Sequence, residues 1–86
     1  MKRVEFWKEK REKVLEERWI DMEELSEMIA NNEAIRSIPN LNHSNQKIFL
    51  IQYQGYIVCV PYVEDEEKIF LKTAYYARKY NKLFNS

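Results

Sequence analysis

The sequence has few of the residues that build disulfides, metal cages and phosphate-binding loops. Its 86 residues include one cysteine, one histidine and one glycine. A lone Cys59 excludes an internal disulfide and a cysteine-based metal cage, and its place in an apolar run predicts a buried thiol. One histidine does not anchor a metal by itself, and one glycine excludes a P-loop and a glycine-rich dinucleotide motif. We therefore expect neither a metal nor another cofactor.

Long hydrophobic runs are also missing. The longest one, residues 56–63, contains Pro61 and is far too short to cross a membrane. The N-terminal residues do not read as a signal peptide, so we expect a cytoplasmic protein without a membrane partner. Hydrophobic residues make up 45% of the chain and charged residues 33%, which is typical of a globular domain. The length predicts a single domain over residues 1–86.

Charges of opposite sign are segregated along the chain, although 14 basic residues balance 14 acidic ones. Residues 1–20 carry a net charge of +2, residues 21–67 one of −7 and residues 68–86 one of +5. A basic end of this kind favours an anionic partner. The alternative is that the charges only solvate an exposed face.

Two helices are expected in the first third of the chain. Residues 4–18 carry apolar side chains near helical spacing, with oppositely charged residues three or four positions apart. After a break at Trp19, Asp21 is a good N-cap for a second helix, and Glu24 completes a pair that resembles a capping box. We expect Trp7 and Trp19 to belong to the core rather than to a ligand site.

Strands dominate the second half of the chain. Three of them are expected in close order, at residues 47–53, 56–63 and 68–74. A turn at Gly55 joins the first two strands, and residues 35–38 are a possible fourth strand. Residues 75–85 are expected to form a helix. This order predicts an α+β fold of two N-terminal helices, an antiparallel β-meander of three to four strands and a C-terminal helix.

The basic C-terminal segment carries residues that suit RNA. Lys72 interrupts an otherwise apolar strand, and basic residues then alternate with tyrosines. Cations bind phosphate, and tyrosine rings stack on the bases of single strands. Lysine and arginine also stabilise the charge of a phosphoryl-transfer transition state, and a tyrosine hydroxyl can orient a 2′-OH. The predicted catalytic residues are Lys72, Arg78 and Tyr75, and the predicted RNA-binding residues are Lys68, Lys79, Tyr76, Tyr80 and Lys82.

Each of these assignments has a structural alternative. The aromatic residues between 76 and 84 alternatively pack the last helix on the sheet. Lys72 alternatively protects an edge strand against aggregation. His43 lies in a polar loop, where exposure to solvent is expected rather than a role as a general acid. The RNA hypothesis requires the basic and tyrosine side chains to share one open surface.

Most of the chain resembles a known family, and the resemblance is strongest over residues 45–79. The run Asn45-Gln46-Lys47-Ile48-Phe49 leads into the hairpin around Gly55, Val60-Pro61-Tyr62-Val63 precedes an acidic turn, and Ile69-Phe70-Leu71-Lys72-Thr73 precedes Arg78-Lys79. This pattern resembles the small toxins of bacterial type II toxin–antitoxin operons, near the BrnT-like branch of the RelE/ParE superfamily.

The resemblance implies a RelE-like fold and an endoribonuclease that needs no metal and blocks translation. It implies two partners, namely RNA or the ribosome as the target and a cognate antitoxin, a small DNA-binding protein through which oligomers can form. On the family pattern, Lys72 and Arg78 match basic positions near the active surface. ParE-like members instead hold a protein target without catalysis. A protein-binding toxin and an inactive family member that acts only as an interaction module therefore stay open as alternatives.

Overall fold

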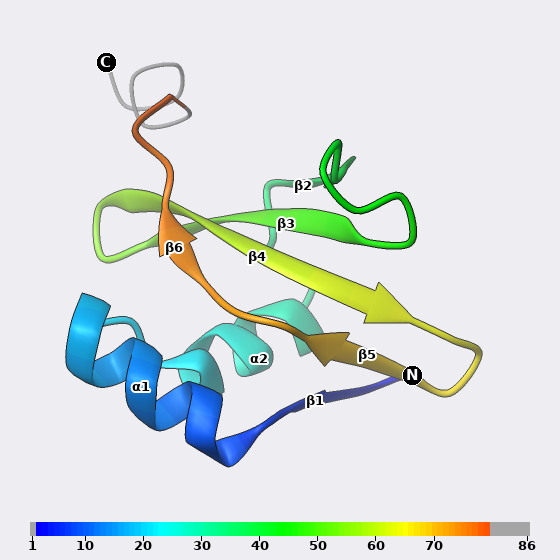
Figure 1. The fold of residues 1–86 in the computed structure, drawn as a ribbon, viewed down its shortest axis with the longest axis horizontal. Coiled ribbons are helices and arrows are strands. Elements are labelled where there is room, and N and C mark those ends of the chain that lie inside the picture. Colours follow the sequence, from blue (N-terminus) through cyan, green and yellow to red (C-terminus); the bar gives the residue numbers. More distant parts are fainter. Residues whose placement is uncertain (1, 80–86) are drawn as a thin grey trace.

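In the computed structural model, which describes residues 2–79, two helices cover one face of a twisted sheet (Figure 1). The elements in chain order are β1 (Arg3–Phe6), α1 (Lys8–Arg18), α2 (Met22–Ala30), β2 (Arg36–Pro39), β3 (Lys47–Tyr53), β4 (Tyr56–Glu64), β5 (Lys68–Leu71) and β6 (Tyr75–Tyr76). The strand order is β1-β5-β4-β3-β2, and β6 pairs with β4 beside this path. Neither helix within residues 2–79 has the length and hydropathy needed to span a bilayer.

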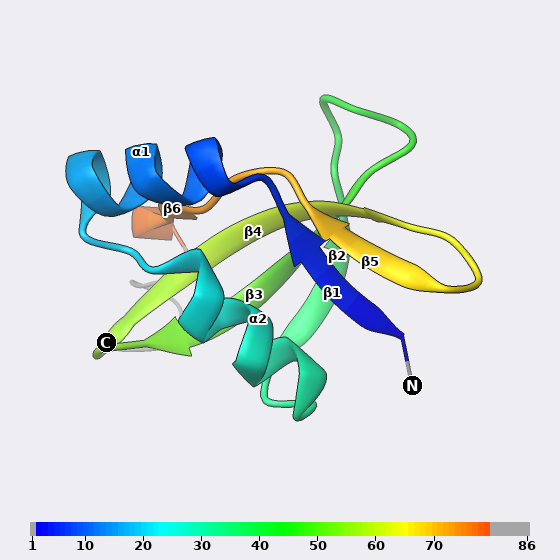
Figure 2. The same cartoon turned by 90° about the horizontal axis from the view of Figure 1, so that it is seen from below.

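The first strand lies where the sequence predicted the beginning of a helix. Arg3–Phe6 pairs in parallel with β5, and the two strands lie side by side at one edge of the sheet (Figure 2). The many charges that follow along α1 favour a helix, but Val4 and Phe6 alternate with polar residues and pack against the core. The predicted antiparallel meander of three to four strands is therefore wrong, because residues 2–79 form a mixed sheet of six strands.

The predicted C-terminal helix over residues 75–85 is also wrong at its beginning. Tyr75–Tyr76 form β6, which pairs antiparallel with Cys59 and Val58 of β4. On the side of β4 that faces β5, only residues 62–64 of β4 pair with β5. The earlier residues on that side of β4 are therefore available to pair with this short strand. Residues 80–85 of the predicted helix lie outside the described residues. The expected RelE-like architecture is corrected to a small α+β domain with two helices and a mixed sheet.

The main core lies between the helices and the sheet. Its fully buried side chains include Val14 from α1, Leu25 from α2, and Ile51, Val58 and Leu71 from the strands. A smaller cluster covers the opposite face of the sheet and consists of Ile48, Leu50, Ile57 and Cys59, with Ile38 and Ala77 packed against it. Cys59 is buried, as expected.

The two tryptophans do not belong to this core. Trp7 is 55% exposed and Trp19 is 79% exposed, so their predicted core role is wrong. Trp7 is the N-cap of α1 and Trp19 is its C-cap, so both indoles lie where the helix meets a loop. The helical spacing of the sequence predicts that Trp7 and Trp19 lie on the same face of α1 as Val14. The backbone of a cap residue is not helical, so the side chain of such a residue need not point toward that face.

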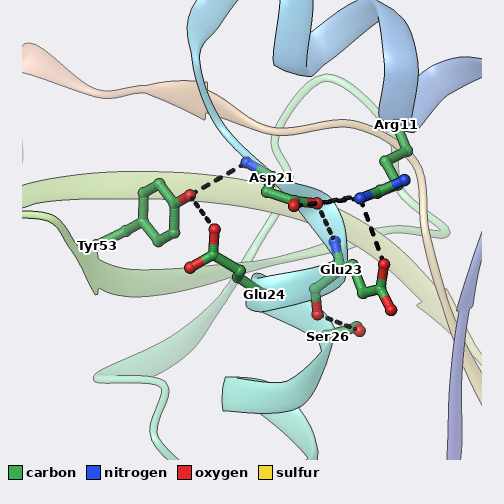
Figure 3. Close-up of polar contacts among 6 residues, drawn as sticks. All are labelled: Arg11, Asp21, Glu23, Glu24, Ser26 and Tyr53. Atoms are coloured by element: carbon green, nitrogen blue, oxygen red, sulfur yellow. Dashed lines mark hydrogen bonds and ion pairs between the residues drawn. The ribbon is translucent and has the colours of Figure 1, made fainter.

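A polar network fixes the beginning of α2 against α1 and the sheet (Figure 3). Asp21 is the N-cap, as expected, and its carboxylate accepts from the backbone N of Glu23 at 2.9 Å and from Nε of Arg11 at 2.9 Å. A capping box predicts that the backbone N of Asp21 donates directly to the side chain of Glu24. In the structure, the hydroxyl of Tyr53 lies between these two groups. The backbone N of Asp21 donates to the hydroxyl of Tyr53 at 3.2 Å, and this hydroxyl donates to Glu24 at 3.1 Å. The half-buried network ties both helices to β3.

Candidate functional site

A groove of about 430 Å³ forms where three distant segments meet. These segments are the beginning of α1, the loop between β2 and β3, and the chain that follows β5. The residues that line it include Trp7, Lys10, His43, Lys72, Thr73 and Tyr75. We call it the cationic groove, because Lys10 and Lys72 give it positive charge.

The position of Lys72 is fixed by the sheet and by two aromatic rings. It follows β5 directly, and its backbone N donates to the carbonyl of Pro61 at 2.8 Å. Its Nζ lies 5.3 Å from the ring centre of Trp7 and 5.4 Å from that of Phe70. Cation–π contacts of this length hold an ammonium group while leaving it accessible to an anion. The alternative of an edge-strand lysine fails, because β5 lies between β1 and β4.

His43 enters the groove from the loop between β2 and β3. This loop is closed by backbone hydrogen bonds, in which His43 donates to Asn40 at 3.3 Å, Gln46 donates to His43 at 2.9 Å and Asn40 donates to Gln46 at 3.2 Å. His43 is exposed, as expected, but its exposed side chain lines the groove that contains Lys72. Sequence reasoning missed this proximity and that of Lys10, because neither residue is near Lys72 in the chain.

The two tyrosines of β6 point to opposite sides of the strand, since successive strand residues alternate. Tyr75 pairs with Cys59 and lines the cationic groove. Burial raises the pKa of the Cys59 thiol, and a side-chain hydrogen bond with Tyr75 lowers it in part. Tyr76 instead packs edge-on against Tyr56, with ring centres 5.7 Å apart. The thiol therefore stays protonated at neutral pH, and only one tyrosine of the pair belongs to the groove.

The other predicted site residues are distributed around the molecule. Arg78 and Lys79 line a neighbouring groove of about 530 Å³, which meets the cationic groove at Tyr75. Lys68 lies at the other end of β5, with its Nζ 3.8 Å from a carboxylate oxygen of Glu5. Tyr80 and Lys82 lie outside the described residues. Of the predicted residues that the structure describes, Lys72 and Tyr75 line the cationic groove, Arg78 and Lys79 line the groove that adjoins it, and Lys68 lies apart from both.

A second groove lies at the other end of α1 and has a different character. It has a volume of about 590 Å³ and is lined by Arg18, Trp19, Tyr56, Tyr76 and Arg78. We call it the aromatic groove. It shares no lining residue with the cationic groove. Of the predicted site residues, Tyr76 and Arg78 line the aromatic groove, and Arg78 also lines the groove that adjoins the cationic groove.

The cationic groove can attract a phosphate but has no side chains arranged to hold a metal. Within residues 2–79, no group of three or more His, Cys, Asp or Glu side chains is placed around a common point. The helix α1 begins at this groove, and Trp7 provides no side-chain cap, so the positive end of the helix dipole adds to the charge of Lys10 and Lys72. This arrangement favours a phosphodiester over a neutral ligand.

Known proteins give no assignment for the cationic groove. No protein-family model, no curated protein and no solved structure matches the chain. Function is therefore inferred from the groove's own chemistry, namely two ammonium groups, an imidazole and a phenol.

Proposed function

We propose that this chain is the toxin of a bacterial type II toxin–antitoxin pair and that it cleaves RNA in the cationic groove without a metal ion. The observation that carries the proposal is the convergence on one groove of Lys10 from α1, His43 from the loop between β2 and β3, and Lys72 and Tyr75 from the chain after β5. The resemblance of residues 45–79 to toxins of this class supports it. Its target is RNA in the cytoplasm, free or on the ribosome, and cleavage blocks translation.

The chemistry that these side chains supply fits cleavage of an RNA backbone. The 2′ oxygen attacks the adjacent phosphorus, the bond from phosphorus to the 5′ oxygen breaks, and a cyclic phosphate remains. A base must accept the 2′ proton, and an acid must return a proton to the leaving 5′ oxygen. His43 accepts the 2′ proton and then donates it to the leaving 5′ oxygen, acting as base and acid in turn. Lys72 and Lys10 stabilise the added negative charge, and Tyr75 orients the 2′-OH.

A cleavage assay with the purified chain tests this proposal. Single-stranded RNA is incubated with excess EDTA, and the products are analysed for cyclic phosphate ends. We expect Lys72→Ala to slow cleavage by about 100-fold or more, because preorganised charge at a transition state has effects of this size. His43→Ala is expected to slow it by a similar factor through loss of acid–base catalysis.

The matched control is Lys68→Ala. Lys68 is the first residue of β5 and Lys72 directly follows its last, but Lys68 pairs with Glu5 outside the groove. Its removal changes the net charge equally and should leave cleavage nearly unchanged. Equal losses for the two lysine variants would show that only overall charge matters, and full activity of Lys72→Ala would refute catalysis in this groove.

A toxin that holds a protein target without catalysis is the second candidate. The exposed aromatic groove favours it, because exposed tryptophan and tyrosine rings are typical of protein-binding surfaces. Expression in cells without an antitoxin separates the two candidates. Arrest with shortened mRNA that disappears in a Lys72→Ala, His43→Ala double variant supports cleavage. Arrest that persists in this variant, with intact mRNA, supports the protein-binding toxin.

A further inference from the structure

The C-terminal end of α1 carries a tryptophan that contributes little to the fold. Trp19 is 79% exposed, and its φ of 61° places its backbone in the left-handed region. This conformation is unfavourable for a residue with a bulky side chain, and glycine is the usual residue at such a helix end. The exposed indole gives almost no burial in return. The unfavourable backbone and the exposed indole together indicate that Trp19 makes contacts outside the chain.

Two tyrosines complete the surface around this indole. Tyr56 is 58% exposed and Tyr76 is 38% exposed, and their rings stand at 74° to one another. Perpendicular rings form a corner that accepts one bulky side chain. Bases stack on open ring faces, whereas in this edge-to-face pair the edge of one ring covers part of a face of the other. The geometry of the aromatic groove therefore favours a protein segment over single-stranded RNA.

Two arginines determine the charge that this groove accepts. Nη1 of Arg18 donates to the carbonyl of Ala74 at 3.1 Å and to the hydroxyl of Thr73 at 3.4 Å, which holds the guanidinium at the end of α1. Arg78 lines the groove from the chain after β6. A fixed guanidinium pairs well with carboxylates through its planar set of donors. Tryptophan, tyrosine and arginine are also the residues that contribute most to binding at protein interfaces.

We propose that the aromatic groove binds a segment of a partner protein in which acidic residues flank one bulky apolar side chain. The apolar side chain packs into the corner between Tyr56 and Tyr76 and against Trp19. The flanking carboxylates pair with Arg18 and Arg78. This binding goes beyond the proposed RNA cleavage and does not depend on it, because the two grooves share no lining residue.

Nuclear magnetic resonance of the ¹⁵N-labelled full chain tests the proposal. The probe is a synthetic eight-residue peptide with a central Leu-Phe pair and three acidic residues on each side. We expect it to shift the indole N–H signal of Trp19 and to leave that of Trp7 in place. Trp7 lines the cationic groove and so serves as an internal reference for the other site. Versions of the peptide with lysine for the acidic residues, or alanine for Leu-Phe, should bind at least about tenfold more weakly.

A substitution at Trp19 separates binding from folding. Trp19→Gly removes the indole and relieves the left-handed backbone, so we expect the melting temperature to stay equal or rise. Peptide affinity, followed through the amide signal of Tyr76, should fall at least about tenfold. Ile35→Ala is the matched control, because Ile35 is an exposed apolar residue outside the aromatic groove. It should leave the affinity unchanged.

Several results would overturn the proposal. These are an absence of any shift at millimolar peptide, a shift of Trp7 as large as that of Trp19, and an unchanged affinity in Trp19→Gly. A ten-nucleotide single-stranded RNA that shifts Trp19 more strongly than the peptide would assign the groove to nucleic acid. Signals of Trp19 that move with protein concentration in the absence of peptide would assign it to a second copy of the chain.

Discussion

Among the described residues with a positive φ, Gly55 and Trp19 differ most in how well their side chains suit this conformation. Gly55 has a φ of 85° in the turn between β3 and β4, and Trp19 has a φ of 61° at the end of α1. Glycine adopts this conformation without a steric penalty, whereas other residues do so at a cost. Substitutions at the two positions should therefore change stability in opposite directions.

We expect Gly55→Ala to lower the free energy of unfolding by about 1 kcal/mol. A Cβ at this position would meet no heavy atom within 4 Å, so the loss comes from the backbone and not from a clash. Urea denaturation measures it. Gly55→Asn is the control, since asparagine tolerates the left-handed region better and should lose less. Equal stability of the alanine variant and the original chain would contradict this account of the turn.

Residue-scale features of this kind were predictable from the sequence because their causes are local. Gly55 follows Gln54 between two apolar runs, and this pattern specifies a tight hairpin. Asp21 precedes an apolar stripe and acts as a cap through its own side chain. The exposure of Trp19 was not predictable, because the helical spacing of apolar residues does not reveal where the last turn of a helix leaves the core.

At the scale of elements, the beginning of α2 is the main polar junction of the fold. The side-chain hydrogen bond from Arg11 lowers the pKa of Asp21, and the backbone hydrogen bond from Glu23 lowers it further. An unfolded aspartate titrates near its ordinary value of about 3.9. The stabilisation by ionised Asp21 is therefore complete above that pH and is lost as the pH falls through the lower folded pKa.

Variants of Asp21 test this junction. Asp21→Ala removes both the cap and the ion pair with Arg11, and we expect it to lower the free energy of unfolding by about 1–2 kcal/mol at pH 7. Asp21→Asn retains a capping oxygen and loses only the charge, so its loss should be smaller. The difference between Asp21→Asn and the original chain should shrink in acid, as measured by urea denaturation at pH 7 and pH 2.5. A difference independent of pH would exclude the ion pair as its cause.

The strands differ in how far the sequence specified them. β3 begins and ends at the predicted residues, because its apolar run is bounded by a polar loop and by a turn. β1 was missed because its partner is β5, and Val4 lies opposite Ile69, far away along the chain. A parallel pair needs a long crossover connection, and no local pattern announces which distant strand will return beside the first. The antiparallel pairs β3–β4 and β4–β5 were predictable because their strands are neighbours in the sequence.

At the scale of the whole molecule, the same limit applies to the candidate site. The alternation after β5 identified Lys72 and Tyr75, which do share the cationic groove. It also placed Tyr76 and Arg78 with them, but the pairing of β6 with β4 directs Tyr76 to the aromatic groove. His43 and Lys10 join the cationic groove only through the folded arrangement of a loop and a helix. The charge pattern along the chain predicts an anionic ligand, and the topology determines which side chains line the cationic groove.

The two grooves lie at opposite ends of α1, and this predicts that their activities are separable. The helix Lys8–Arg18 has eleven residues and so a length of about 16 Å. Lys72→Ala should slow RNA cleavage by about 100-fold or more and leave the peptide affinity unchanged. Trp19→Gly should weaken peptide binding and leave the cleavage rate unchanged. The combined variant should show the sum of both effects, since distant sites without shared partners are usually additive. The measurement is a cleavage rate and a peptide dissociation constant for each of the four proteins. Loss of cleavage in a well-folded Trp19→Gly variant would instead show that RNA extends along α1 and contacts both grooves.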